Sequence, residues 1–330
     1  MQLTVAVTGA GGFIGSHLVE TLVGAGHRVR ALARYNARSS AGWLDDLDSD
    51  VLDAVDVRFG DVRDPASVRT LLDGVDAACH LAALVTVPYS YELPASYVQT
   101  NVVGTHNVLD VARQLGTPRV VCASCGEVYG TARTVPMAED HPLEARSPYA
   151  ATKVAADKLA ESYHLSFGLP VVVLRPFNTY GPRQSSRAVI PTIISQLAAG
   201  QERIAIGSLT PTRDFSFVAD ITRAFLAAVT GPDTMLGRVY NAGSGREISV
   251  EAVAHLIAGI MGSRVELAPE ARRTRPAASE IHRLHADSSA LQAVTSWRPE
   301  HTLEEGLAAT VAWICRPGNL RYYDLHRYSI

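Results

Sequence analysis

The fold class is decided by residues 3–15, which read LTVAVTGAGGFIG. A run of apolar residues ends at Thr8, and three glycines then follow at intervals of three. Glycines at this spacing permit a tight turn and let a pyrophosphate approach the N–H groups at the positive end of a helix. The pattern predicts a strand, a turn and a helix over residues 14–25. The residues expected to bind a dinucleotide here are Gly9, Gly12, Phe13, Ile14 and Gly15.

The alternation of strand and helix continues along the first half of the chain. Extended runs such as RVRALAR (28–34), RVVCAS (119–124) and PVVVLRPF (170–177) are separated by predicted helices. These helices are expected over residues 65–72, 95–115 and 149–167. The alternation is typical of βαβ units, so we expect an α/β fold with a Rossmann-type doubly wound parallel sheet.

The pattern loosens after Asn178, where stretches that contain Pro and Gly separate shorter elements. We expect residues 1–178 to form an NAD(P)-binding Rossmann domain, to which a later segment near 212–240 returns. Residues 179–330 are expected to form mainly a smaller C-terminal α/β domain that binds the substrate.

Composition and charge exclude several classes of partner. The 330 residues carry a formal net charge of −3 with no continuous basic stripe, and no apolar run approaches the roughly 18 residues of a membrane span. We therefore expect neither nucleic acid nor a membrane as a partner. The first residues lack a basic leader, and the four cysteines are too few for a disulfide framework, which indicates the cytoplasm. Cys122 and Cys125 have no second Cys or His pair, so no metal site is expected.

The end of the second predicted strand bears on the choice of cofactor. A carboxylate there accepts hydrogen bonds from the ribose of NAD, whereas an Arg pairs with the 2′-phosphate of NADP. This chain has Ala33 and Arg34, which favours NADP; NAD stays open, because Arg34 can also be a solvated charge beside Tyr35 or Asn36. Asp61 is expected near the adenine or as a turn residue. Further cofactor contacts are expected from Val62, Leu81, Ala82, Ala83 and Asn101.

Tyr149 and Lys153 form the most informative pair of residues. Four residues apart on a predicted helix, they share one face. An ammonium there can lower the pKa of the phenol and hold a nicotinamide ribose, while the tyrosine exchanges a proton with a substrate hydroxyl.

These motifs identify a resemblance that runs along almost the whole chain. The segments TGAGGFIGSHL, HLAAL, NVVGTHNVL, EVYG, SPYAATK, RPFNTYGPRQ and TRDFSFVAD resemble those of extended short-chain dehydrogenases/reductases of the nucleotide-sugar epimerase/dehydratase family. More narrowly, YNARSSAGWLDDL, VPYSYELPASYVQTN and RAVIPTII resemble bacterial 4,6-dehydratases that act on UDP- or GDP-linked N-acetylhexosamines, of the kind found in legionaminic acid pathways.

The resemblance implies a role for each residue of the site. Tyr149 would act as base at the sugar 4-hydroxyl, with Lys153 as its electrostatic partner, while hydride passes from C4 to a tightly bound and recycled cofactor. In dehydratases, a Glu in the position of Glu127 removes the C5 proton from the 4-keto intermediate, and a neighbouring acid protonates the departing 6-hydroxyl. The stretch expected to be catalytic is Ser124, Cys125, Gly126 and Glu127.

This stretch departs from the family pattern at two residues. Cys125 replaces a Thr or Ser that bonds the 4-oxygen, and the thiol either takes a catalytic part or only fills space. Gly126 replaces the acid, so elimination must use Glu127 twice, use a water, or not occur. Restoring an Asp at residue 126 is expected to raise the rate of dehydration. A 4,6-dehydratase is the main prediction, a C4 or C5 epimerase is the alternative, and a non-catalytic NADP-binding sensor or scaffold is the third.

Residues that hold the substrate are also implied by the resemblance. The substrate is expected to be a UDP-, GDP- or dTDP-linked hexose, with its diphosphate held by Asn178, Arg183, Arg213 and Arg275. Thr86 and Ser90 are expected to line the hexose pocket, and Val189 and Ile190 to contact the substrate as well. Family members pair through helices that correspond to residues 95–115 and 147–167, so a homodimer is expected.

Overall fold

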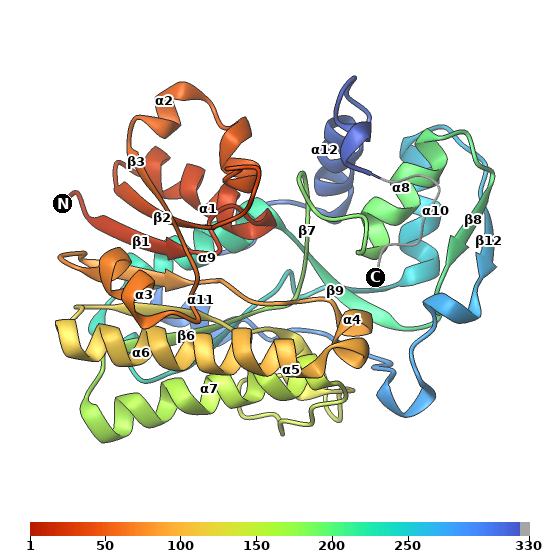
Figure 1. Ribbon diagram of the computed structural model, residues 1–330. Helices are drawn as coiled ribbons and strands as arrows, with labels where there is room; N and C mark the ends of the chain where they lie inside the picture. The colour runs from red at the N-terminus through yellow and green to blue at the C-terminus, as the bar shows by residue number, and fades with distance from the viewer. Residues whose placement is uncertain (324–330) are drawn as a thin grey trace.

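The computed structural model describes residues 1–323 and has a seven-stranded sheet at its centre (Figure 1). The strand order is β10-β6-β5-β4-β1-β2-β3, and every pairing is parallel. The strands are β1 (Thr4–Thr8), β2 (Arg28–Arg34), β3 (Val55–Gly60), β4 (Ala77–His80), β5 (Val120–Ala123), β6 (Val171–Pro176) and β10 (Val239–Ala242). The strand order reverses between β1 and β4, so the predicted doubly wound Rossmann-type fold is confirmed.

Helices bury both faces of this sheet. On one face, α1 (Phe13–Gly24) and α9 (Val218–Thr230) pack around Val5 and Val7 of β1. On the other face, α3 (Pro65–Leu72), α6 (Gly104–Leu115) and α7 (Pro148–Phe167) pack around Ala6 (Figure 1). Because both faces are covered, the strands are nearly continuous apolar runs, which is why they stand out in the sequence.

The predicted helices differ from the observed ones mainly near residue 100. The helix expected over 95–115 is a succession of α5 (Pro94–Tyr97), the π-helical turn η2 (Val98–Val103) and α6. The short helices α2 (Ser49–Leu52), α4 (Val87–Glu92) and α11 (Ser289–Val294) were not predicted, because one or two turns carry too little periodicity. Within the described part of the chain, no helix is both long and apolar enough to cross a membrane.

A smaller group of elements packs beside the carboxyl end of the sheet. It contains a three-stranded sheet of β7 (Asn178–Tyr180), β9 (Thr212–Phe217) and β11 (Glu247–Ser249), and a parallel pair, β8 (Arg203–Ile206) and β12 (Glu266–Pro269). The helices α8 (Val189–Ala198), α10 (Val250–Ile260) and α12 (Leu303–Ile314) enclose its core. Between these elements the chain returns to the large sheet as α9 and β10. We therefore propose a cofactor-binding part of residues 1–178 with 218–242, and a substrate-binding part made of the rest.

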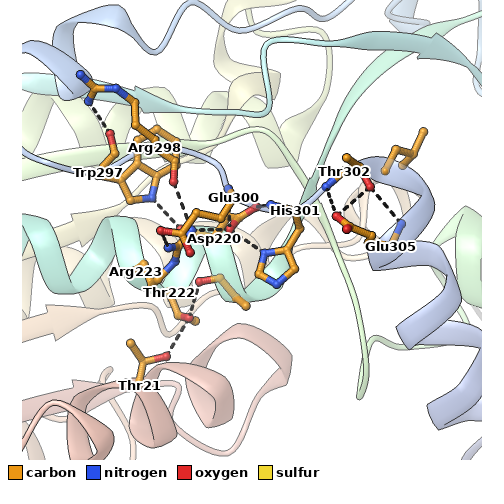
Figure 2. A network of polar contacts seen from close by, with 12 residues as sticks. Thr21, Asp220, Thr222, Arg223, Trp297, Arg298, Glu300, His301, Thr302 and Glu305 are labelled. Carbon is orange, nitrogen blue, oxygen red and sulfur yellow. Dashed lines mark hydrogen bonds and ion pairs between the residues drawn. The ribbon is translucent and has the colours of Figure 1, made fainter.

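Buried Asp220 of α9 joins the two parts (Figure 2). Its carboxylate accepts hydrogen bonds from the backbone N–H groups of Glu300 and His301, both at 3.2 Å, and it pairs with Arg223. The indole of Trp297 donates to the Asp220 carbonyl at 2.8 Å. These bonds fix the segment before α12, which begins at a capping box between Thr302 and Glu305. Nearby, the Thr21 hydroxyl of α1 donates to Thr222 of α9 at 2.8 Å.

Candidate active site

A cleft of about 1160 Å³ lies at the carboxyl ends of the strands, where the strand order reverses. Ligands bind at this position in open α/β sheets. Both parts of the chain line the cleft, the large sheet through the ends of β1, β2, β4 and β5 and the smaller part through residues near 206–215 and 273–280.

The glycine turn at the end of β1 is held by close backbone contacts. Gly9 has a φ of +70°, and a Cβ on Gly15 would lie 2.1 Å from the Gly9 carbonyl oxygen. Gly12 is the N-cap of α1 and offers no side-chain cap, so the first N–H groups of the helix face the cleft. This cradle fits a pyrophosphate, because bare N–H groups and the helix dipole attract anions.

Sequence reasoning missed Gly11. A Cβ there would lie 2.1 Å from the carbonyl oxygen of Ala41, and the Gly11 carbonyl accepts the N–H of Trp43 at 3.0 Å. Only glycine lets the 41–43 loop lie against the turn. The Gly11-Gly12 doublet was the available signal.

A chain of buried hydrogen bonds fixes the loop after β4. The Thr8 hydroxyl accepts the N–H groups of Leu81 and Ala82, each at 3.1 Å, and contacts His80 Nδ1 at 2.8 Å. On its other side, His80 Nε2 lies 3.0 Å from the Thr105 hydroxyl. Burial, with the charge of Lys153 nearby, lowers the pKa of His80 to about 3, so the imidazole is neutral. The chain holds Leu81, Ala82 and Ala83 as lining of the cleft.

At the ribose end of the cleft, Arg34 is exposed at the end of β2, and Arg38 lines the cleft beside it. Val62 and Asp61 also lie in the lining. The Asp61 carboxylate is bonded by Arg63, which lowers the pKa of that carboxyl, so Asp61 is already paired. No carboxylate stands at the end of β2 itself.

Asn101 does not line the cleft, in contrast to the expectation from the sequence. Its buried amide accepts the N–H of Leu84 at 2.8 Å and donates to the Leu84 carbonyl and to Thr152, both at 3.0 Å. Asn101 therefore holds the loop that lines the cleft and does not itself face a ligand.

Tyr149 and Lys153 lie one turn apart on α7, and both line the cleft. The Lys153 ammonium donates to the carbonyl of Ala123 at 2.5 Å, at the end of β5. The Tyr149 hydroxyl is in hydrogen-bonding contact with the thiol of Cys125. Burial raises the pKa of Tyr149 well above its usual value, and the neighbouring Cys125 and Glu127 add to the effect.

The Ser124–Glu127 stretch forms the floor of the same region. Burial raises the pKa of the Cys125 thiol to about 11, although the charge of Lys153 opposes this, so Cys125 is a protonated thiol at neutral pH. Gly126 lies against Phe177, and a Cβ on Gly126 would stand 3.0 Å from the ring. The buried Ser124 hydroxyl has no hydrogen-bond partner within residues 1–323.

Glu127 is paired with Arg275. Two guanidinium nitrogens donate to its two carboxylate oxygens, at 3.1 and 3.2 Å. Burial alone would raise the pKa of Glu127, but the charge and hydrogen bonds of Arg275, with a contribution from Arg213, hold it below its usual value. Arg275 was expected at the diphosphate; it does line the cleft, but its guanidinium is engaged by Glu127.

Two further substrate residues differ from expectation. Arg183 lies outside the lining and makes a two-pronged ion pair with Glu20 of α1, at 2.7 and 2.9 Å. Ser90 is fully buried, donates to the Val87 carbonyl and does not reach the cleft; on the same short helix, Tyr89 does. The expected residues that do line the cleft are Thr86, Asn178, Val189, Ile190 and Arg213.

Comparison with known proteins agrees with this geometry. The family model described as GDP-mannose 4,6 dehydratase matches residues 6–310. A dTDP-glucose 4,6-dehydratase of Streptomyces griseus is 36% identical over 319 residues, which are 95% of this chain and 94% of the relative. A UDP-glucose 4-epimerase of Mycolicibacterium smegmatis is 35% identical over 311 residues, 92% of this chain and 96% of the relative.

A solved structure of a similar enzyme carries both a cofactor and a ligand. The dTDP-glucose 4,6-dehydratase DesIV of Streptomyces venezuelae, a double mutant with NAD and DAU bound, superposes with a TM-score of 0.82 at 29% identity. The match covers 94% of this chain and 97% of that one. The glycine turn, the Tyr149–Lys153 pair and these matches together show that the chain belongs to the GDP-mannose 4,6-dehydratase family, among the nucleotide-sugar dehydratases and epimerases of the extended short-chain dehydrogenase/reductase fold.

Proposed function

We propose that this protein is an NAD(P)-dependent 4,6-dehydratase of a nucleotide-activated hexose, acting through a 4-keto intermediate. One observation carries the proposal: the Glu127 carboxylate lies in the same cleft as Tyr149 and Lys153, close enough to raise the pKa of the tyrosine. A proton-transfer residue for the 4-hydroxyl and a carboxylate for the C5 proton are the two groups that ketone formation and elimination need.

Tyr149 receives the proton of the sugar 4-hydroxyl when the ketone forms. When bound, the oxidised nicotinamide accepts the hydride that leaves C4. Burial disfavours the phenolate form of Tyr149 that accepts this proton. The positive charge of Lys153, on the same side of the cleft, is therefore needed to stabilise the phenolate. Cys125 contacts the Tyr149 hydroxyl where the family has Ser or Thr, so the thiol occupies the hydrogen-bonding position of that hydroxyl.

Elimination is assigned to Glu127 alone. A carboxylate that takes the C5 proton becomes a carboxylic acid, and the acid can deliver that same proton to the departing 6-hydroxyl, which leaves as water. Elimination then needs no second acid, in agreement with Gly126. The hydride taken from C4 is afterwards returned to C6, C5 receives a proton from solvent, and Tyr149 gives its proton back to solvent, so the net change is the loss of one water. Ser124, the other hydroxyl of this stretch, is buried and aimed at no partner within residues 1–323, so it is proposed to bond the sugar.

The second candidate function is C4 or C5 epimerisation. Gly126 favours it, because epimerisation needs a ketone but no acid for a leaving group. The Glu127–Arg275 pair favours it as well, because a carboxylate held by a guanidinium is a weak base. Tyr149 and Lys153, both retained in the cleft, speak against the non-catalytic sensor or scaffold.

The finer assignments of cofactor, substrate and assembly are also proposals. Arg34 and Arg38, with no carboxylate at the end of β2, support NADP over NAD. We propose a UDP-, GDP- or dTDP-linked hexose as substrate, with its diphosphate near Asn178, Arg213 and Arg275. We propose a homodimer in the cytoplasm, paired through α6 and α7, where exposed Phe167 of α7 lies against Arg113 of α6.

Incubation of the purified protein with a panel of UDP-, GDP- and dTDP-hexoses, followed by mass spectrometry, tests the proposal. A product lighter by one water supports the dehydratase. A product of unchanged mass and altered stereochemistry identifies the epimerase, and no turnover of any member of a broad panel would favour the non-catalytic role.

A further inference from the structure

The Glu127–Arg275 pair brings together two residues with competing tasks. Glu127 is on the short helical turn η3 (Gly126–Tyr129) at the end of β5, and Arg275 is on the loop before η6 (Ala277–Ser279), 148 residues later. Their side chains are 13% and 22% exposed, so both are largely removed from water while lining the cleft. A guanidinium in this position can bond either a carboxylate or a phosphate, because its planar fork fits both.

Among residues 1–323, the other cation that acts on Glu127 is Arg213, whose effect is smaller than that of Arg275. Arg213 of β9 donates to the Thr212 carbonyl at 2.9 Å and pairs with Glu280 at 3.4 Å. On the protein side, Tyr149 and Cys125 face Glu127 as uncharged groups, and Lys153 donates to the Ala123 carbonyl. The charge that keeps Glu127 ionised therefore comes chiefly from Arg275.

We propose that Arg275 is a counterion shared between Glu127 and the substrate diphosphate, so that diphosphate binding draws the guanidinium away and Glu127 takes up a proton from solvent. The inference rests on the proposed nucleotide-sugar function. With the sugar in place, the same withdrawal turns Glu127 into a stronger base, and the proton that it takes is the one on C5. The paired carboxylate is thus a weak base until a diphosphate arrives.

The physical reason is the free-energy cost of leaving the buried Glu127 carboxylate charged without a cation beside it. A buried carboxylate without a cation has its pKa raised, since desolvation disfavours the charged form. The folded protein offsets this with Arg275, and binding that removes Arg275 restores the desolvation effect.

Proton uptake on binding measures this directly without any turnover. Calorimetric titration of the cofactor-loaded protein with UDP, GDP or dTDP, in two buffers of different ionisation enthalpy at mildly acidic pH, gives the number of protons taken up per site. We expect wild type to take up a measurable fraction of one proton more than Glu127→Gln does. The difference between the two proteins cancels protons that belong to the terminal phosphate of the nucleotide.

Two variants separate the shared counterion from other causes. Glu247→Gln, which removes a carboxylate that is paired with Arg283 outside the lining of the cleft, should keep the extra uptake. Arg275→Gln should bind the nucleoside diphosphate more weakly and lose the extra uptake, because Glu127 has no cation to give up. Thermal melting of each variant establishes that it is folded.

Equal uptake by wild type and Glu127→Gln, with tight binding in both, would overturn the shared counterion and leave the proposed function standing. If none of the three nucleoside diphosphates binds to the folded protein, the shared counterion and the nucleotide-sugar proposal fail together.

Discussion

Gly126 lies against the ring of Phe177: a Cβ would stand 3.0 Å from Cδ1 and 3.1 Å from Cγ, so the ring would have to shift by a few tenths of an ångström to admit a side chain. Phe177 is itself buried, so the ring can move only if its neighbours move. The residue that lacks the family acid is therefore packed closely as a glycine, and a side chain at residue 126 requires the Phe177 ring to shift.

This packing bears on the expectation that Gly126→Asp would raise the rate of dehydration, because the Phe177 ring must give way before an acid can be placed. The single variant should be destabilised by about 1–3 kcal/mol through overpacking, with no gain in rate. Gly126→Asp with Phe177→Leu provides space, and we expect the double variant to exceed Phe177→Leu in dehydration rate by roughly 100-fold or more, the usual value of a placed general acid. Denaturation and product mass measure the two effects. A faster, fully stable single variant would contradict the packing argument.

Tyr149→Phe should abolish turnover of every substrate while the protein stays folded, because no group remains to accept the proton of the 4-hydroxyl. Tyr163→Phe is the matched control: it removes a hydroxyl from the same helix that bonds His106 outside the cleft. Product mass and the absorbance of the reduced nicotinamide follow both variants. Normal turnover by Tyr149→Phe would remove the tyrosine from the mechanism.

Glu127→Gln should separate the two halves of the reaction. Oxidation at C4 does not need the carboxylate, so the reduced cofactor should accumulate on addition of substrate, whereas loss of water should stop. Stopped-flow absorbance detects the first event and mass spectrometry the second. An epimerase would instead give an isomer of unchanged mass from the wild-type protein, and continued loss of water by the variant would exclude Glu127 as the base.

Arg34→Asp tests the choice of cofactor. If Arg34 bonds a 2′-phosphate, the variant should lose roughly 1.5–3 kcal/mol of binding free energy for NADP(H), the usual value of a hydrogen bond to a charged group, and much less for NAD(H). Arg28→Asp, at the opposite end of β2 and exposed, is the control for a change of net charge. Equal losses for both cofactors would show that Arg34 is a surface charge.

Asp220→Ala should destabilise the protein by about 1–3 kcal/mol, because the N–H groups of Glu300 and His301 lose their acceptor and Arg223 loses one of its partners. Asp233→Ala removes the partner of Arg119, but the Asp233 side chain is 89% exposed, so the loss there should be below about 1 kcal/mol. Urea denaturation measures both changes. Similar losses for the two variants would mean that Asp220 does not anchor the segment before α12.

The Glu20–Arg183 pair predicts an acid-dependent loss of stability. Burial alone would raise the pKa of Glu20, but hydrogen bonds from His17 and Arg183 lower it from 4.5 to about 2. The folded pKa is depressed, so the pair contributes its full stability above pH 4.5 and loses it as the pH falls towards 2. The difference in melting temperature between wild type and Glu20→Gln should be at its full size just above the upper value and shrink below it. A difference that is independent of pH would contradict the assignment.

The sequence predicted the central sheet well because its strands are buried on both faces and its helices are long. It also predicted a return of the chain to the first domain near residues 212–240; in the structure β9 (Thr212–Phe217) lies in the smaller sheet, and α9 and β10 lie against the large one. The π-helical turn at Val98–Val103 could not be predicted from the sequence, because a single wider turn changes the spacing of apolar residues very little.

The parts of the site that follow from motifs were easier to predict than those that depend on tertiary packing. Gly9, Tyr149 and Lys153 line the cleft because local spacing fixes their direction. Ser90 and Tyr89 differ by one position on a short helix, which turns the side chain by about 100°, and only one of them reaches the cleft.

Long-range partners were the least predictable feature. The motif that contains Arg183 suggested a phosphate ligand, yet its partner Glu20 lies 163 residues earlier in the sequence. Nothing local indicates such a pairing, and the same is true of Arg275 and Glu127.

The return of the chain to the large sheet has a consequence for synthesis. Helix α1, which carries the glycine turn, buries its apolar face against α9, and β10 completes the sheet beside β6. A nascent chain released only as far as Asn178 therefore presents the apolar face of α1 and the free edge of β6 to water. The packing around α1 and the large sheet is therefore complete only after residue 242 has been synthesised, so the first half of the polypeptide depends on the second for its finished core.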